Sequence, residues 1–200
     1  MLILRTSPAS PFGRKVRIAA EVAAVADRIR IENADTGNPD DSLRRQNPLG
    51  KIPTLLMEDG EPLFDSRVIV EYLNEIAPAP VLVPSGAQRI PVLRQQALAD
   101  GMLDAAILQV YEGRFRPPEL HSEKWVAHQR GKMERALAYM AHHLSAPRAG
   151  APHIGEIGQA CALGYMDLRF AGSWRSEYPA LVSWLEDFAR RTPAFAMTAP

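Results

Sequence analysis

Apolar residues near the start of the chain change their spacing twice. Residues 2–4 form a short apolar run, residues 16–23 have apolar side chains at helical spacing, and residues 29–32 alternate between apolar and polar. A period of two is typical of a strand with one buried face, and a period near 3.6 is typical of an amphipathic helix. The chain therefore begins with a predicted βαβ unit.

A hairpin and a second helix are predicted next. Residues 54–57 are strand-like, and Asp59-Gly60 is a turn that joins antiparallel strands. From Ser66 onward, apolar side chains lie on one helical face until Pro78, which cannot continue a helix. The complete order, βαβ-ββα, predicts an α/β domain with a mixed sheet of four strands.

Strand signals disappear after residue 77. Residues 78–86 are rich in proline, which interrupts helices, and four helical periods follow this segment. We therefore expect residues 1–77 to form the α/β domain, residues 78–86 to form a linker, and residues 87–200 to form an all-α helical bundle. The predicted helices span residues 92–112, 123–144, 156–170 and 179–191, and residues 145–152 are predicted to be a loop.

Charge and cysteine content narrow the functional class. The 200 residues include 23 Lys+Arg and 23 Asp+Glu, so the net charge is zero and we expect neither nucleic acid nor an anionic membrane as a partner. The first residues lack the basic-then-apolar pattern of a secretory signal, and we expect a cytoplasmic protein.

The single cysteine, Cys161, excludes an intramolecular disulfide. The histidines lack the spacing of metal ligands, and we expect no bound metal.

Two backbone surfaces for a peptide ligand are predicted side by side. The segment Asn47–Leu55 combines turn residues with the start of a buried strand, and the strand edge beside Pro53 offers N–H and C=O groups. Further along the chain, Ser66 opens a helix whose free N–H groups attract a carboxylate. Together these features predict the binding of a small acidic peptide.

Several of these segments match one protein family. Ser10-Pro11-Phe12, the turn Gly50-Lys51-Ile52-Pro53 and the helix start Asp65-Ser66, followed by a helical second half, together resemble the cytosolic glutathione S-transferases. Ala99-Asp100-Gly101 and Arg116-Pro117 are similar to the bacterial YibF-type branch. The resemblance implies a thioredoxin-like first domain that binds glutathione and a helical domain that supplies much of the pocket for an electrophile.

The resemblance also implies how glutathione is held. Pro53 would be a cis-proline, although sequence alone favours the trans form, and the backbone of Ile52 would pair with the cysteinyl part of the tripeptide. Ser66 and the first N–H groups of its helix would bind the γ-glutamyl carboxylate, with Asp65 on the ammonium. Ser66 as a simple N-cap is the alternative. The implied glutathione-binding residues are Phe12, Lys51, Ile52, Pro53, Asp65 and Ser66, with Lys51 facing the glycyl carboxylate.

Catalysis in this family requires ionisation of the glutathione thiol. Ser10 precedes Pro11 at a helix start, so its hydroxyl is a candidate hydrogen-bond donor to the sulfur where the helix dipole also favours negative charge. The alternative is that Ser10 serves only as an N-cap. Ser7 on the same loop is the second candidate catalytic residue. In some serine-type relatives the working residue stands two positions before the proline, where this chain has Ala9.

The helical half is expected to supply the electrophile pocket. Its candidate residues, chosen by their position late in the first long helix, are Tyr111, Arg114 and Phe115, with Arg116 in the loop that follows. Asp100 and Asp104 lie one helical turn apart earlier in the same helix. This spacing would allow both carboxylates to lie on the cleft face of the helix, but we favour a polar stripe or a dimer contact.

The buried helix of the second domain has an unusual start. Relatives begin it with a capping box, a Ser or Thr followed three residues later by an acid. The matching segment here is His153-Ile154-Gly155-Glu156, in which histidine replaces the hydroxyl. We expect a cap weaker by about 1 kcal/mol unless a ring nitrogen of His153 accepts the hydrogen bond. Protonation of that ring in acid should then destabilise the fold.

The most direct interpretation is a homodimeric glutathione transferase, of the kind that serves detoxification, which stabilises the glutathione thiolate and conjugates it to small electrophiles. Two alternatives remain. The first is a glutathione-binding or regulatory protein without turnover. The second is a glutathione-dependent reductase of disulfides or peroxides, which would need two bound glutathiones because Ser10 cannot form a mixed disulfide.

Overall fold

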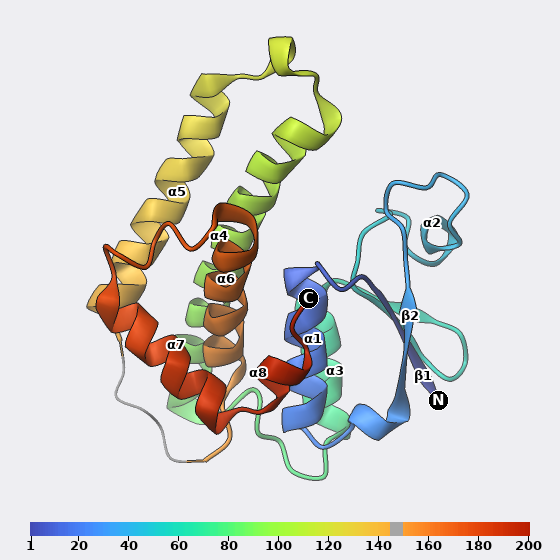
Figure 1. Ribbon diagram of the computed structural model, residues 1–200. Coiled ribbons are helices and arrows are strands. Elements are labelled where there is room, and N and C mark those ends of the chain that lie inside the picture. The colour runs from blue at the N-terminus through green and yellow to red at the C-terminus, as the bar shows by residue number, and fades with distance from the viewer. Residues whose placement is uncertain (145–149) are drawn as a thin grey trace.

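The computed structural model describes residues 1–144 and 150–200. The predicted loop at 145–152 therefore falls mainly outside the described residues. A small sheet lies on one side of the molecule and the long helices lie on the other, with α1 and α3 between them (Figure 1). Within the described ranges, every helix is too short or too polar to span a lipid bilayer.

The sheet has the predicted mixed topology. Its strands are β1 (Leu2–Thr6), β2 (Ile29–Asn33), β3 (Thr54–Leu56) and β4 (Pro62–Leu63), in the order β2-β1-β3-β4. Strand β1 is parallel to β2 and antiparallel to β3, and β3 is antiparallel to β4. The parallel pair comes from the βαβ unit and the antiparallel pair from the hairpin, which confirms the predicted fold of the first half.

Helices α1 (Pro11–Val22) and α3 (Ser66–Ile76) begin at the two positions that the sequence predicts. Ser10 is the N-cap of α1. Asp65 is the N-cap of α3, because its carboxylate accepts a hydrogen bond from the N–H of Arg67. The alternative of Ser66 as the N-cap is therefore wrong. The short helix α2 (Leu43–Gln46) escaped prediction because four residues are too few to show a helical period.

The second half is helical throughout its described part, as predicted. Helix α6 forms its centre, since nearly every residue of its first three turns is buried. The last helix, α8, returns the chain to α1 (Figure 1), where the guanidinium of Arg14 donates a hydrogen bond to the carbonyl of Phe195. The helices are α4 (Arg89–Phe115), α5 (Glu123–His142), α6 (Ile154–Phe170), α7 (Pro179–Arg191) and α8 (Ala194–Met197), of which α8 was not predicted.

The segment between the two halves is packed against both of them. Leu82 is fully buried and Val83 is nearly so. The side-chain oxygen of Asn74 on α3 accepts hydrogen bonds from the N–H groups of Leu82 and Val83, and the carbonyl of Leu82 accepts one from Ile154. A single hydrophobic core thus runs through both halves. The exact domain limits at residues 77 and 87 stay a prediction.

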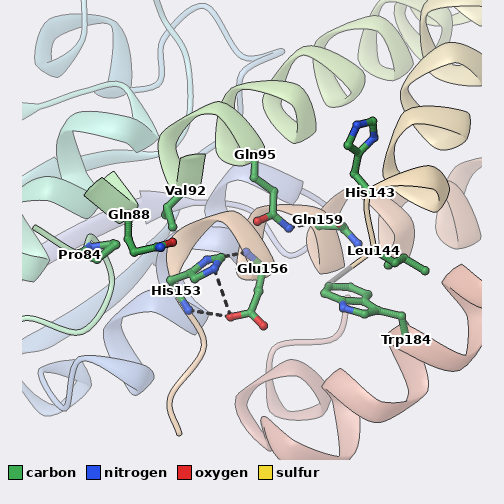
Figure 2. Close-up of a pocket in the computed structure, with 10 residues that line it drawn as sticks. All are labelled: Pro84, Gln88, Val92, Gln95, His143, Leu144, His153, Glu156, Gln159 and Trp184. Atoms are coloured by element: carbon green, nitrogen blue, oxygen red, sulfur yellow. Dashed lines mark hydrogen bonds and ion pairs between the residues drawn. The ribbon is translucent and has the colours of Figure 1, made fainter. Parts of the chain in front are cut away.

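The start of α6 carries the complete capping box. A ring nitrogen of His153, Nδ1, lies 3.2 Å from the backbone nitrogen of Glu156 and accepts its hydrogen bond, while the Glu156 carboxylate accepts from the N–H of His153 at 3.1 Å (Figure 2). The ring nitrogen of His153 thus replaces the hydroxyl of the usual cap. The cap therefore keeps its hydrogen-bond acceptor, which is the case in which no loss of about 1 kcal/mol was expected. The expected loss of stability in acid stays a prediction.

Candidate functional site

One cleft brings together most of the predicted site residues. It has a volume of about 730 Å³ and lies between the β1–α1 loop, residues 44–52, and the facing sides of α4 and α6. Of the predicted residues, Pro53, Asp65 and Ser66 do not line this cavity, and neither does Arg116. Those that do are Ser7, Ser10, Phe12, Lys51, Ile52, Tyr111, Arg114 and Phe115.

Ser10 is held by the start of α1. Its hydroxyl oxygen accepts a hydrogen bond from the N–H of Gly13 at 3.0 Å, and its N–H donates to the carbonyl of Ser7. Gly13 is required here, because a Cβ at this position would lie 1.8 Å from Oγ1 of Thr6 on β1. The Ser10 proton has no acceptor among the described residues. The hydroxyl can therefore cap the helix and still donate a hydrogen bond into the cleft.

The segment before β3 presents an unpaired backbone edge. Asn47 donates from its amide to the carbonyl of Lys51 and to the hydroxyl of Thr54, which fixes the turn, and Gly50 adopts the left-handed region with φ of 59°. The Ile52–Pro53 peptide bond is cis, as the resemblance implies. Among the described residues, the N–H and C=O of Ile52 have no hydrogen-bond partner. This edge can accept an extended peptide.

A second backbone site is the N-terminus of α3, whose first residues do not line the cleft. Because the Asp65 carboxylate takes the N–H of Arg67, the N–H groups of Ser66 and Val68 keep no hydrogen-bond partner within the described ranges. Two free N–H groups at the positive end of the helix dipole form a site for a carboxylate. Asp65 itself is exposed, and its second oxygen lies 3.6 Å from Nε of Arg67.

Asp100 is part of the site's support and not a surface residue. Its carboxylate lies 2.6 Å from the ammonium of Lys15 on α1, and both side chains are buried. The other oxygen lies 3.5 Å from Nε of Arg67. The interpretation of Asp100 as a polar stripe or a dimer contact is therefore wrong. Asp104, one turn further, lines the cleft, where burial and then the negative charge of Asp100 raise its pKa.

The far wall of the cleft combines aromatic rings with arginines. The rings of Tyr111 and Phe115 meet edge to face at 5.1 Å, and the guanidinium carbon of Arg114 lies 5.6 Å from the centre of the Tyr111 ring. On α6, the guanidinium carbon of Arg169 lies 5.9 Å from the centre of the Tyr165 ring. Burial raises the pKa of the Tyr165 hydroxyl, which stays protonated at neutral pH.

Sequence analysis did not assign several lining residues of this cleft to the site, among them Arg44, Tyr165 and Arg169. Tyr165 and Arg169 stand four residues apart, the spacing that places two side chains on one helical face. The sequence therefore showed that the two side chains share a face of one helix. It did not show that this face of α6 lies against the cleft.

A second cavity, of about 390 Å³, lies at the start of α6 and contains none of the predicted site residues (Figure 2). Polar side chains dominate it, and Trp184 forms one wall. The side chains of Gln95 and Gln159 lie next to each other in its wall and are joined by a hydrogen bond of 3.0 Å. The described residues contain no group of three or more His, Cys, Asp or Glu side chains that could bind a metal ion.

Family models match both halves of the chain. The model of the N-terminal domain of glutathione S-transferases matches residues 9–76, and the model of the C-terminal domain matches residues 123–187. The chain belongs to the glutathione S-transferase family. The match to the first model includes Ser10, the cis-proline turn and the start of α3, which are the parts of the site that the resemblance predicts.

Relatives in this family cover all or nearly all of the chain. The uncharacterized GST-like protein YibF of Escherichia coli is 34% identical over 96% of this chain and 95% of its own length. A glutathione transferase family member from Pseudomonas fluorescens Pf-5, crystallised with bound glutathione, is 37% identical, covers 100% of this chain and 99% of its own, and superposes with a TM-score of 0.92. The same protein with bound S-(propanoic acid)-glutathione superposes with a TM-score of 0.88 at 36% identity, with full coverage of both chains.

Proposed function

We propose that this protein binds reduced glutathione in the cleft, stabilises its thiolate and conjugates it to small electrophiles. The observation that carries the proposal is the unpaired Ile52 backbone edge beside a cis-proline, in one cleft with the free hydroxyl of Ser10. A relative that is 36–37% identical over the whole chain was crystallised with glutathione and with an S-substituted glutathione, which supports the same ligand here.

In this proposal the protein binds each of the three residues of the tripeptide. Its cysteinyl backbone adds to the edge at Ile52, and its γ-glutamyl carboxylate meets the N–H groups of Ser66 and Val68. Asp65 lies beside its ammonium. Lys51 is exposed on the rim of the cleft and attracts the glycyl carboxylate. Phe12 supplies an apolar wall below the sulfur.

Ser10 is the proposed donor to the sulfur. A free thiol with a pKa of about 8.5 is only a few per cent ionised at neutral pH. A hydrogen bond to the charged sulfur, together with the positive end of α1, lowers that pKa by about one to two units. Ser7 lies on the same cleft wall and is the alternative donor. The thiolate sulfur then forms a bond to the electrophilic carbon, and the leaving group departs with its electron pair or the adduct takes a proton.

Calorimetry with reduced glutathione tests binding, and the ultraviolet absorbance of the thiolate against pH tests activation. We expect binding by the wild type and a thiol pKa that is about one unit higher in Ser10→Ala than in the wild type. Ser7→Ala is the matched control on the same loop. An unchanged pKa in Ser10→Ala with a raised pKa in Ser7→Ala transfers the role to Ser7. Absence of binding to the wild type refutes the proposal.

Turnover separates the proposed transferase from its two alternatives. Conjugation of a chlorodinitrobenzene supports the transferase. Binding of glutathione without any conjugation supports a regulatory protein. Consumption of disulfides or peroxides with no conjugation supports the reductase.

We further propose a cytoplasmic homodimer that detoxifies electrophiles. The buried free thiol of Cys161 suits a reducing compartment, where reduced glutathione is also abundant. Light scattering at defined concentration measures the dimer directly, and a monomeric mass at micromolar concentration would contradict it.

A further inference from the structure

The cleft carries an excess of positive charge that glutathione alone does not use. Among the described residues, its lining contains four cationic side chains and one carboxylate, Asp104, whose pKa is raised by burial. The cationic residues are Arg44, Lys51, Arg114 and Arg169.

Two of these four cationic side chains already have another role, one in holding a loop and one in the proposed binding of glutathione. Arg44 donates to the backbone carbonyls of Asn38 and Thr36 and so holds its own loop. Lys51 stands on the rim next to Ile52, where the proposed function puts the glycyl carboxylate. Arg114 and Arg169, the arginine pair, are left on the opposite wall.

The arginine pair has no carboxylate partner in the described part of the chain. On each of the two helices, the acid closest to the arginine in sequence pairs with another residue. Glu112 on α4 lies 3.5 Å from the guanidinium of Arg116, and Asp167 on α6 lies 2.7 Å from that of Arg175. The arginine pair instead stacks near the aromatic rings of Tyr111 and Tyr165, which hold the guanidinium groups beside the cavity without neutralising them.

The position of Tyr165 relates the arginine pair to the reacting sulfur. Tyr165 lines the cleft together with Ser10, and both also line a small separate cavity between α1 and α6. The wall that carries Arg169 therefore adjoins the Ser10 hydroxyl. A group attached to the sulfur of a glutathione bound there enters the space between Ser10 and the arginine pair.

We propose that the arginine pair binds an anionic group of the second substrate, so that the protein prefers small electrophiles that carry a carboxylate. The inference rests on the proposed function. Guanidinium groups match the planar geometry of a carboxylate and bind it with charge-assisted hydrogen bonds. Tyr111 and Phe115 cover the apolar body of the same molecule.

Binding of two S-substituted glutathiones tests the charge preference without turnover. The probes are S-(para-carboxybenzyl)glutathione and its size-matched amide, S-(para-carbamoylbenzyl)glutathione, titrated by calorimetry. We expect the wild type to bind the acid about tenfold more tightly than the amide at low ionic strength, with a smaller preference at high salt because these arginines are exposed.

Substitution of the arginine pair assigns the preference to its residues. In Arg114→Gln and Arg169→Gln we expect a loss of about tenfold in affinity for the acid, with affinity for the amide within about twofold of wild type. Arg130→Gln is the matched control, because it removes one charge from an exposed position on α5 outside the cleft. Equal affinity of the wild type for the two probes overturns the inference, and so does an equal loss for both probes in the variants.

Turnover provides an independent measurement. Chlorodinitrobenzoate and its amide react in the same way, since the thiolate sulfur bonds to the ring carbon that carries chlorine and chloride leaves with the bonding electron pair. We expect kcat/KM for the acid alone to fall about tenfold in the arginine variants. If glutathione and the neutral probe bind but the acid shows no advantage, only this inference fails. If glutathione itself does not bind, the proposed function fails with it.

Discussion

The ammonium group of Lys15 on α1 lies 2.6 Å from the carboxylate of Asp100 on α4, and the two side chains are 0% and 2% exposed. This ion pair joins the α/β half to the helical half behind the wall of the cleft. The second oxygen of Asp100 faces Nε of Arg67 at the N-terminus of α3. The Asp100 carboxylate thereby connects α1 and α3 of the first half to α4, which lines the cleft.

Removal of one partner of this pair should be costly. In Lys15→Met we expect a loss of about 3–5 kcal/mol in the free energy of unfolding, because Asp100 keeps a buried charge without its main partner. The double variant Lys15→Met/Asp100→Leu should recover much of that loss. Urea denaturation of the three proteins measures the effect. The exposed pair of Arg89 and Glu71 is the control, and Arg89→Gln should cost less than about 1 kcal/mol. A similarly small loss in Lys15→Met would contradict the expectation.

The His153 cap should be replaceable by a hydroxyl but not by a methyl group. We expect His153→Ala to lower the free energy of unfolding by about 1 kcal/mol, since the N–H of Glu156 loses its acceptor. In His153→Ser the new hydroxyl accepts the same hydrogen bond, so stability should stay near that of the wild type. Thermal melting at neutral pH compares the three proteins. Equal melting temperatures for the Ala and Ser variants would show that the ring nitrogen does not cap the helix.

Cys161 should be chemically inert in the folded protein. It is fully buried in α6, and burial raises the pKa of its thiol to about 12, so the reactive thiolate is absent at neutral pH. We expect an aromatic disulfide reagent to label no thiol in native protein and one thiol per chain in urea, with labelling that follows the unfolding transition. Rapid labelling without denaturant would refute this expectation.

Asp104 should make stability depend on pH in a defined direction. Burial, then the charge of Asp100, raises its pKa above 3.8, so the folded protein binds this proton more tightly than the unfolded chain does. The resulting stabilisation is complete below pH 3.8 and is lost as the pH rises through the folded-state value. Asp104→Asn should therefore melt roughly 1–2 °C above wild type at pH 7, and the gain should shrink on acidification.

The same pair of measurements on Asp27→Asn, an exposed position with no role in the cleft, provides the control. It should show no difference at either pH. A gain in Asp104→Asn that grows toward acid pH would contradict the sign derived above.

Local features of the sequence determined the elements and much of the glutathione side. A short apolar run, an alternating segment and the Asp59-Gly60 turn indicated the strands, the period near 3.6 indicated the helices, and Pro11 after Ser10 located the start of α1. The turn Gly50-Lys51-Ile52-Pro53 lies where the unpaired edge is found. These features depend on residues within a few positions of each other, so they can be recognised from the sequence without the tertiary structure.

Only the tertiary structure decided which side chains meet across the two halves. Lys15 and Asp100 are 85 positions apart and both belong to residue types that are rarely buried, so nothing in the sequence indicated a buried pair. Tyr165 and Arg169 lie on a helix that is apolar on most sides, and its packing against α1 and α4 alone turns them toward the cleft. The spacing of apolar residues shows which segments are helical, because it depends only on neighbours in the sequence. Which side chains contact each other depends on how helices from distant parts of the chain pack together.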